Sequence, residues 1–338
     1  MTTLLTRLVS RDRPIDRADW HGFFDRLADR HLTRGEGAAL LASLSTAMPD
    51  DDTLHALFDC LDERRGDPGV TFPDAVNIVG TGGGPRTLNV STAAAIVAAS
   101  IGVRVIKTGS KAYTSKFGSF DLLEALGVKL TGDFQQTGER LARHGVAFAG
   151  SFVYPAEIGM LASQIVPLDL RTVGTFVNRV GPFLAAMPVG AQLTGFSDDR
   201  MLPALRLLAD RVRDRRVWLC GNGFHADELI SCTDNVVYPN SGESFTLRVG
   251  SAAPAEGSLE ELRPWADPVE QFLAVLAGDA PAAAVHSVCL NAAAMGVLSG
   301  RFTEWDTAFA AALDAVRGGA ASELLARVRA GDSAAVHV

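Results

Sequence analysis

Cysteine is scarce in this sequence, and its few positions exclude two common roles. The four cysteines among the 338 residues are Cys60, Cys220, Cys232 and Cys289. They lie far apart, without the short intervals that zinc ligands share, whereas a small secreted fold held by disulfides is much richer in cysteine. We therefore expect reduced, partly buried thiols in a cytoplasmic protein.

A surplus of basic charge and a long apolar run are also missing. The formal net charge is −8 at pH 7, whereas binding to a phosphate backbone needs clustered lysine and arginine. The most apolar predicted helix, Ala93–Ile101, is too short to span a bilayer, and no signal peptide is visible after Met1. We expect neither nucleic acid nor a membrane as a partner.

Two familiar nucleotide-binding motifs are absent, although glycine is abundant. No Gly-Lys-Ser/Thr closes a Walker loop, and the dinucleotide fingerprint fails in its spacing and in its later ribose-binding acid. The chain instead has an apolar run, Val76–Val79, that leads into Gly80, Gly82, Gly83 and Gly84. The run predicts a buried strand, and the glycines predict a turn whose N–H groups an anion can approach closely.

A helix start and a lysine extend this predicted phosphate site. Ser91 and Thr92 open an alanine-rich helix, whose free N–H groups and dipole favour an anion. A second predicted strand, Val103–Ile106, leads to Lys107 at the same sheet edge. A further loop rich in glycines and hydroxyls follows, with Gly109, Ser110, Lys111, Thr114, Ser115, Gly118 and Ser119. One glycine loop often only joins a strand to a helix, but two beside one lysine favour a polyphosphate.

Two adjacent acids, Asp227 and Glu228, come shortly after a predicted strand at Arg216–Cys220. Mg²⁺ prefers carboxylates together with phosphate oxygens and water, so the pair is a candidate metal site for a polyphosphate. The alternative is that both acids cap a helix N-terminus.

The order of predicted elements indicates an α/β fold with two parts. Residues 1–70 have apolar residues at helical spacing, with breaks at Pro14, Gly35 and Pro49, and form a small N-terminal helical domain. Residues 71–338 alternate strands and helices, which predicts a larger α/β domain with a central, mainly parallel sheet flanked by helices. Further strands are predicted at Val128–Leu130, Val146–Phe148, Gln192–Gly195 and within Val236–Arg248.

These motifs together resemble the anthranilate phosphoribosyltransferase family, and more broadly the fold shared with pyrimidine nucleoside phosphorylases. The likeness is carried by Gly80-Thr-Gly-Gly, Asn89-x-Ser-Thr92, Lys107-x-Gly109, Ser115, Gly118-Ser119-x-Asp121 and Asp227-Glu228. The resemblance implies Mg²⁺-dependent transfer of a 5-phosphoribosyl group from 5-phosphoribosyl diphosphate (PRPP) to a small-molecule acceptor, with release of pyrophosphate. It also implies a homodimer formed through the helical domain.

The resemblance assigns roles to single residues. The donor is expected at Gly80, Gly83, Gly84, Thr87, Asn89, Ser91, Thr92, Lys107, Gly109, Lys111, Ser115 and Ser119. Mg²⁺ is expected at Ser91, Asp227 and Glu228. Catalysis falls to Lys107, Asp227 and Glu228, because a stabilised pyrophosphate leaving group needs cations and preorganised donors and no strong protein nucleophile.

Departures from the family pattern lie in the glycine loop and around the expected acceptor. The family loop ends in an aspartate; this chain has Gly84 there and is one residue shorter before Thr87, so a second metal contact is not implied. Thr108 and Ser110 replace the family's anthranilate-contacting His and Asn, and Leu168 replaces its carboxylate-binding arginine. The acceptor is expected at Thr108, Ser110, Tyr154, Glu157, Leu168 and Arg171.

We therefore predict an acceptor other than anthranilate. The acids Glu157 and Asp169 near the lost arginine favour an amine-bearing or cationic acceptor, such as an aminocyclitol or another secondary-metabolite precursor, unless they simply face solvent. Glu157 or His225 is the candidate general base. Three alternatives stay open: a true anthranilate phosphoribosyltransferase of tryptophan biosynthesis, a nucleoside phosphorylase, and a non-catalytic homologue.

Overall fold

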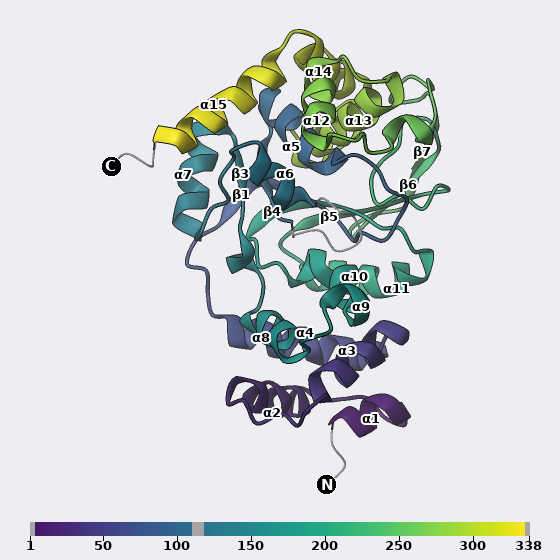
Figure 1. Cartoon of the computed structure of the whole chain (residues 1–338). Coiled ribbons are helices and arrows are strands. Elements are labelled where there is room, and N and C mark those ends of the chain that lie inside the picture. The colour runs from purple at the N-terminus through teal and green to yellow at the C-terminus, as the bar shows by residue number, and fades with distance from the viewer. Residues whose placement is uncertain (1–3, 110–117, 335–338) are drawn as a thin grey trace.

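The computed structural model describes residues 4–109 and 118–334. Figure 1 shows a helical part below and, above it, a twisted sheet covered by helices on both faces. The fold is therefore α/β, with a mostly parallel sheet, as the sequence predicts.

The N-terminal segment forms four helices whose boundaries follow from turn and capping residues. They are α1 (Leu4–Ser10), α2 (Arg17–Ala28), α3 (Glu36–Thr46) and α4 (Asp51–Arg65). The side chain of Asp16 caps α2, and that of Asp50 caps α4 by accepting from the Thr53 N–H at 2.8 Å. Such caps satisfy N–H groups that the first helical turn leaves free. The predicted breaks at Pro14, Gly35 and Pro49 all fall between helices and are confirmed.

The helical part also contains a segment from the middle of the chain. Helices α8 (Ala156–Gln164), α9 (Leu170–Val173) and α10 (Thr175–Leu184) pack against α2 and α3, and they share an apolar cluster with Trp20 and Phe24. The helical part of the fold thus extends beyond the predicted segment 1–70.

The sheet has seven strands in the order β3-β2-β1-β4-β5-β6-β7. The first five in that order are parallel, and β6 and β7 are antiparallel additions at one edge. The strands are β1 (Phe72–Gly80), β2 (Arg104–Lys107), β3 (Val146–Phe148), β4 (Val189–Gly195), β5 (Arg216–Asn222), β6 (Asn235–Pro239) and β7 (Phe245–Leu247).

One predicted strand, Val128–Leu130, is wrong. Gly127 turns the chain with a φ of 73°, and Asp133 already caps the next helix, so only Thr131 makes a bridge, to Ala149. The remaining elements are α5 (Val90–Ser100), α6 (Ser119–Ala125), α7 (Phe134–His144), η1 (Ser151–Val153), η2 (Asp199–Met201), α11 (Leu202–Arg211), η3 (Leu259–Leu262), α12 (Pro268–Ala277), α13 (Ala282–Ser299), α14 (Trp305–Arg317) and α15 (Ala320–Ala334).

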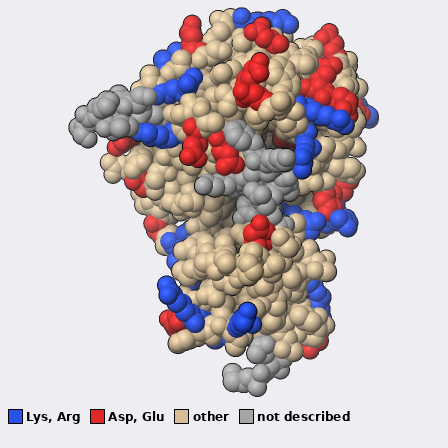
Figure 2. Space-filling model, in the orientation of Figure 1, with Lys and Arg blue, Asp and Glu red and all other residues tan. Residues whose placement is uncertain are grey.

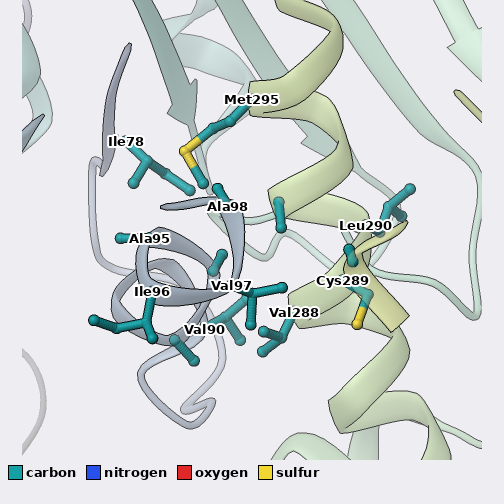
Figure 3. Close-up of a cluster of buried hydrophobic side chains, with 14 of the residues drawn as sticks. Ile78, Val90, Ala95, Ile96, Val97, Ala98, Val288, Cys289, Leu290 and Met295 are labelled. Atoms are coloured by element: carbon teal, nitrogen blue, oxygen red, sulfur yellow. The ribbon is translucent and has the colours of Figure 1, made fainter. Parts of the chain in front are cut away.

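The core above the sheet is built on two alanine-rich helices, α5 and α13. Small side chains let the helices approach each other closely, and Figure 3 shows Val97 facing α13 while Met295 reaches toward Ile78 of β1. By length and composition α13 could cross a membrane, but 83% of it is buried inside the fold, as expected of a core helix. This packing holds the N-terminus of α5 at the carboxyl edge of the sheet.

Candidate active site

The site begins with two glycines at the carboxyl ends of neighbouring strands. Gly80 of β1 is in register with Gly195 of β4. A Cβ on Gly80 would overlap the carboxylate of Asp227, and a Cβ on Gly195 would overlap its main-chain carbonyl. Only glycine at both positions lets residue 227 sit directly on the sheet edge.

Asp227 is held there by the glycine loop. Its Oδ2 accepts a hydrogen bond from the Gly82 N–H at 2.7 Å. Gly82 has a φ of 69°, and its carbonyl accepts from Ser197 Oγ at 2.6 Å. Burial raises the pKa of Asp227 above its usual value, and the Gly82 hydrogen bond and Lys107 partly oppose that shift.

Three buried asparagines fix the backbone of the acidic segment. Asn222 Nδ2 donates to the Glu228 carbonyl at 2.8 Å. Asn291 of α13 pairs with both main-chain groups of Leu229, at 3.2 Å and 2.8 Å. Asn235 Oδ1 accepts from the N–H of Ile230 at 2.9 Å. The sequence analysis missed Asn222 and Asn235; the only signal was an asparagine between Gly221 and Gly223 after a strand.

Lys107 ends β2 with its ammonium group buried under the site. Its Nζ donates to the carbonyls of Ile78 and Thr108, each at 3.3 Å. Burial lowers the pKa of Lys107 to about 8, opposed by the charges of Glu228 and Asp227. The sheet edge therefore brings one buried cation and two partly exposed acids together.

Glu228 supplies the oxygen best suited to a metal ion. Thr87 Oγ1 lies 3.5 Å from its Oε1, while its Oε2 is buried without a partner. Burial and the charge of Asp227 raise the pKa of Glu228 well above its usual value, so a cation beside it would relieve both costs. Both acids and Ser91 line one small pocket.

The donor set fits Mg²⁺ held by few protein ligands. Among the described residues, no group of three or more His, Cys, Asp or Glu side chains is placed to hold a metal. Mg²⁺ does not need such a cage, because it keeps waters and phosphate oxygens alongside one or two carboxylates. Asp227, Glu228 and Ser91 meet that requirement.

The packing around Gly84 accounts for the missing aspartate of the family loop. A Cβ on Gly84 would lie 2.5 Å from the His225 carbonyl and 3.2 Å from Ser197 Cβ. His225 adopts a φ of 54°, which turns its carbonyl toward the loop, and its ring lies 3.9 Å from Asp199. An aspartate therefore has no room at position 84 in this fold.

The other predicted donor residues lie along the same edge. Asn89 is the N-cap residue of α5 but makes no side-chain capping bond. Thr92 is buried, and its hydroxyl has no partner. Gly109 packs so closely on Ser119 that a Cβ would overlap the hydroxyl. The predictions for Ser110, Lys111, Thr114 and Ser115 lie outside the described residues.

The predicted acceptor residues do not form one cluster. Thr108 is fully buried, and its hydroxyl and N–H bond to Asn77 at 3.0–3.1 Å, which gives it a structural contact in place of an acceptor contact. Tyr154 Oη donates to the Gly109 carbonyl at 3.0 Å. Leu168 is 43% exposed, next to α9, the helix that contains Arg171.

Glu157 has a different partner from the one predicted. Its carboxylate accepts from Arg64 Nε at 2.7 Å, and Arg64 also binds Asp25 at 2.6 Å. The residue is 9% exposed and ties α8 to α4 inside the helical part. Because this carboxylate already has a cation, neither acceptor binding nor general base catalysis is supported for Glu157.

We predict that Glu157→Gln mainly changes stability. Losing one charged partner of Arg64 should lower the free energy of unfolding by about 1–3 kcal/mol, while kcat/KM for the acceptor stays within about twofold. Urea unfolding and steady-state kinetics measure both. Asp25→Asn, at the exposed end of the same network, should cost less stability. A tenfold rise in acceptor KM for Glu157→Gln would restore its predicted role.

Comparison with known proteins agrees with this geometry. A family model described as "Glycosyl transferase family, a/b domain" matches residues 72–322. The anthranilate phosphoribosyltransferase of Methylobacterium radiotolerans is 34% identical over 93% of this chain and 91% of its own. The crystal structure of the Thermus thermophilus enzyme of that name superposes with a TM-score of 0.82 and 25% identity, over 98% of this chain and 100% of the other. A Saccharomyces cerevisiae anthranilate phosphoribosyltransferase, in complex with PRPP and Mg, shares the fold with a TM-score of 0.78 at 21% identity, over 98% and 97% of the chains.

The chain is thus a glycosyltransferase, and the α/β domain of that family contains its sheet. Within the class it belongs to the anthranilate phosphoribosyltransferase family. It is an enzyme of the phosphoribosyltransferase type, as the sequence motifs predict.

Proposed function

We propose that this enzyme transfers a 5-phosphoribosyl group from PRPP to a small-molecule acceptor and releases pyrophosphate, with Mg²⁺ bound. The observation that carries the proposal is the convergence of buried Lys107 with the acids Asp227 and Glu228 beside the Gly80–Gly84 loop. Departure of pyrophosphate from the first carbon of the ribose leaves negative charge, which fixed cations and N–H groups stabilise without a protein nucleophile.

The chain's own residues divide that work. The N–H groups of Gly83 and Gly84 and the N-terminus of α5, with Asn89 and Ser91, offer donors to phosphate. Lys107 brings a positive charge from beneath the phosphate-binding loop. Asp227, Glu228 and Ser91 would hold Mg²⁺, which when bound neutralises charge on the leaving pyrophosphate.

We further propose that the acceptor is not anthranilate. Leu168 offers a carboxylate neither charge nor a hydrogen bond, and the Thr108 hydroxyl is already bonded to Asn77. The expected preference for a cationic acceptor has lost its support, because Glu157 pairs with Arg64 and Asp169 caps α9 through Thr172 at 2.9 Å. We therefore propose an acceptor whose binding does not require an arginine at position 168.

We propose that the enzyme is cytoplasmic and forms a homodimer. Figure 2 shows a broad uncharged area on the helical part, and the exposed apolar side chains of this part include Val9, Met160, Val166 and Leu168. An apolar surface of this kind is what a second copy of the chain would cover.

Calorimetric titration tests the donor. Binding of PRPP should require Mg²⁺ and disappear in EDTA, because the carboxylates of Asp227 and Glu228 repel the diphosphate unless a cation lies between them. Free phosphate with ribose 1-phosphate should not bind; if only this pair bound, the enzyme would be a nucleoside phosphorylase. Binding of neither would indicate a non-catalytic homologue.

A panel of aromatic acids and amines, scored by pyrophosphate release, tests the acceptor. We expect anthranilate to be a poor substrate. If anthranilate gave the highest kcat/KM of the panel, the interpretation of Thr108 and Leu168 would be wrong, and the enzyme would be a true anthranilate phosphoribosyltransferase.

A further inference from the structure

Arg86 is an exposed arginine in the middle of the glycine loop, and the loop is fixed on both sides of it. Before it, Gly82 bonds Asp227 at 2.7 Å. After it, Thr87 faces Glu228 at 3.5 Å, and the Leu88 N–H donates to the Leu262 carbonyl at 2.7 Å. The backbone of Arg86 is thereby held beside the two acids, while its side chain is exposed.

Within the part of this sheet edge that the structure describes, Arg86 is a loop cation without a bonded partner. The described parts of the loops after β1 to β5, with η2, contain two other basic side chains besides Arg86. Arg200 is bonded to Asp198 at 2.8 Å and 2.9 Å, and His225 lies 3.9 Å from Asp199. Across the described residues, the Arg86 guanidinium has neither an ion pair nor a hydrogen bond.

The loop that carries Arg86 contains no acid. Residues 80–89 read Gly-Thr-Gly-Gly-Gly-Pro-Arg-Thr-Leu-Asn. Position 84 cannot gain an acid without displacing the His225 carbonyl, which would lie 2.5 Å from the new Cβ. Carboxylates for one metal ion are present in Asp227 and Glu228, but this loop offers none for a second.

The diphosphate of PRPP nonetheless needs more positive charge than one metal ion supplies. The positive charge of Lys107 is shared with the carboxylates of Glu228 and Asp227, which interact with it. A guanidinium is permanently charged and presents several N–H donors in a planar fork that matches phosphate oxygens. Arg86 offers that chemistry at the point where the loop lacks an acid.

We propose that Arg86 binds the diphosphate of the donor directly and replaces a second metal ion, so that the enzyme works with one Mg²⁺ per protomer. The inference rests on the proposed function, since it names how the same site neutralises PRPP.

The test is calorimetric titration of the full-length protein with PRPP in Mg²⁺, comparing wild type, Arg86→Gln and Arg86→Lys. Losing the guanidinium should raise the Kd about tenfold or more, the loss expected for a charge-assisted contact. Lysine should restore part of the affinity. Equilibrium dialysis with Mg²⁺ and saturating PRPP should give one metal ion per protomer.

Arg200→Gln is the matched control, because Arg200 is exposed on a neighbouring loop but paired with Asp198. Its Kd should stay within about twofold of wild type. Arg86→Gln binding PRPP as tightly as wild type, or two Mg²⁺ per protomer, would overturn the role of Arg86 and leave the proposed function standing. Failure of the wild-type protein itself to bind PRPP would overturn both.

Discussion

Changing Asp227 to asparagine is expected to lower kcat/KM for pyrophosphate release by a factor on the order of a hundred to a thousand. The asparagine keeps the side-chain volume and can still accept the hydrogen bond that the Gly82 N–H donates at 2.7 Å. It removes the negative charge with which the site would bind Mg²⁺. The loss should therefore appear both in Mg²⁺ affinity and in turnover.

Steady-state assays at a series of Mg²⁺ concentrations measure this effect. Glu228→Gln should behave in the same way, since both acids line the same pocket. Asp234→Asn is the control on the same segment, because Asp234 pairs with exposed Arg248 at 2.8 Å. Its activity should be unchanged. Wild-type turnover and Mg²⁺ dependence in Asp227→Asn would remove the basis of the proposed metal site.

The position of three candidate site segments at one sheet edge could be predicted from sequence because each segment is short. The strand ending at Gly80, Lys107 at the end of the next strand, and the pair Asp227-Glu228 each lie within a few residues, and parallel strands bring their carboxyl ends together. The alternation of strands and helices along the chain was enough to predict that these segments lie at one edge of the sheet. Lys107 is buried at that edge, whereas Asp227 and Glu228 are partly exposed.

What the sequence did not predict depends on contacts between distant segments. The pairing of Glu157 with Arg64 joins residues 93 positions apart, and no local pattern marks it. Thr108 was assigned to the acceptor because of its place in a motif, yet Asn77 of the neighbouring strand takes its hydroxyl. In both cases a polar side chain found its partner through packing, which a motif does not encode.

Helices α8, α9 and α10 show the same limit of sequence-based prediction at the scale of whole elements. The acceptor was expected at Glu157, Leu168 and Arg171, but the apolar residues of this stretch of the chain continue the cluster of the N-terminal helices. Its amphipathic pattern predicts a buried face but does not say which surface buries it.

The second large effect is expected from Gly195→Ala, which tests the geometry of the site and leaves its chemistry intact. The new Cβ would overlap the Asp227 carbonyl and lie 2.9 Å from the Glu228 nitrogen, and both are backbone atoms that cannot rotate away. The acidic segment must move off the sheet edge. We expect kcat/KM to fall about a hundredfold, because a displacement of about 1 Å is enough for such a loss. The free energy of unfolding should fall by about 1–3 kcal/mol from overpacking.

Gly223→Ala is the control, since nothing lies within 4 Å of a Cβ at that position in the same region of the chain. It should retain both activity and stability. The two effects of Gly195→Ala can be measured separately. Urea unfolding measures the loss of stability from overpacking. Kinetics at low temperature, where the variant stays folded, measure the effect of displacing the acids. If Gly195→Ala turned over like wild type while losing stability, the position of Asp227 against β4 would not matter for catalysis. The acids would then have to act from a conformation other than the one that the two glycines permit.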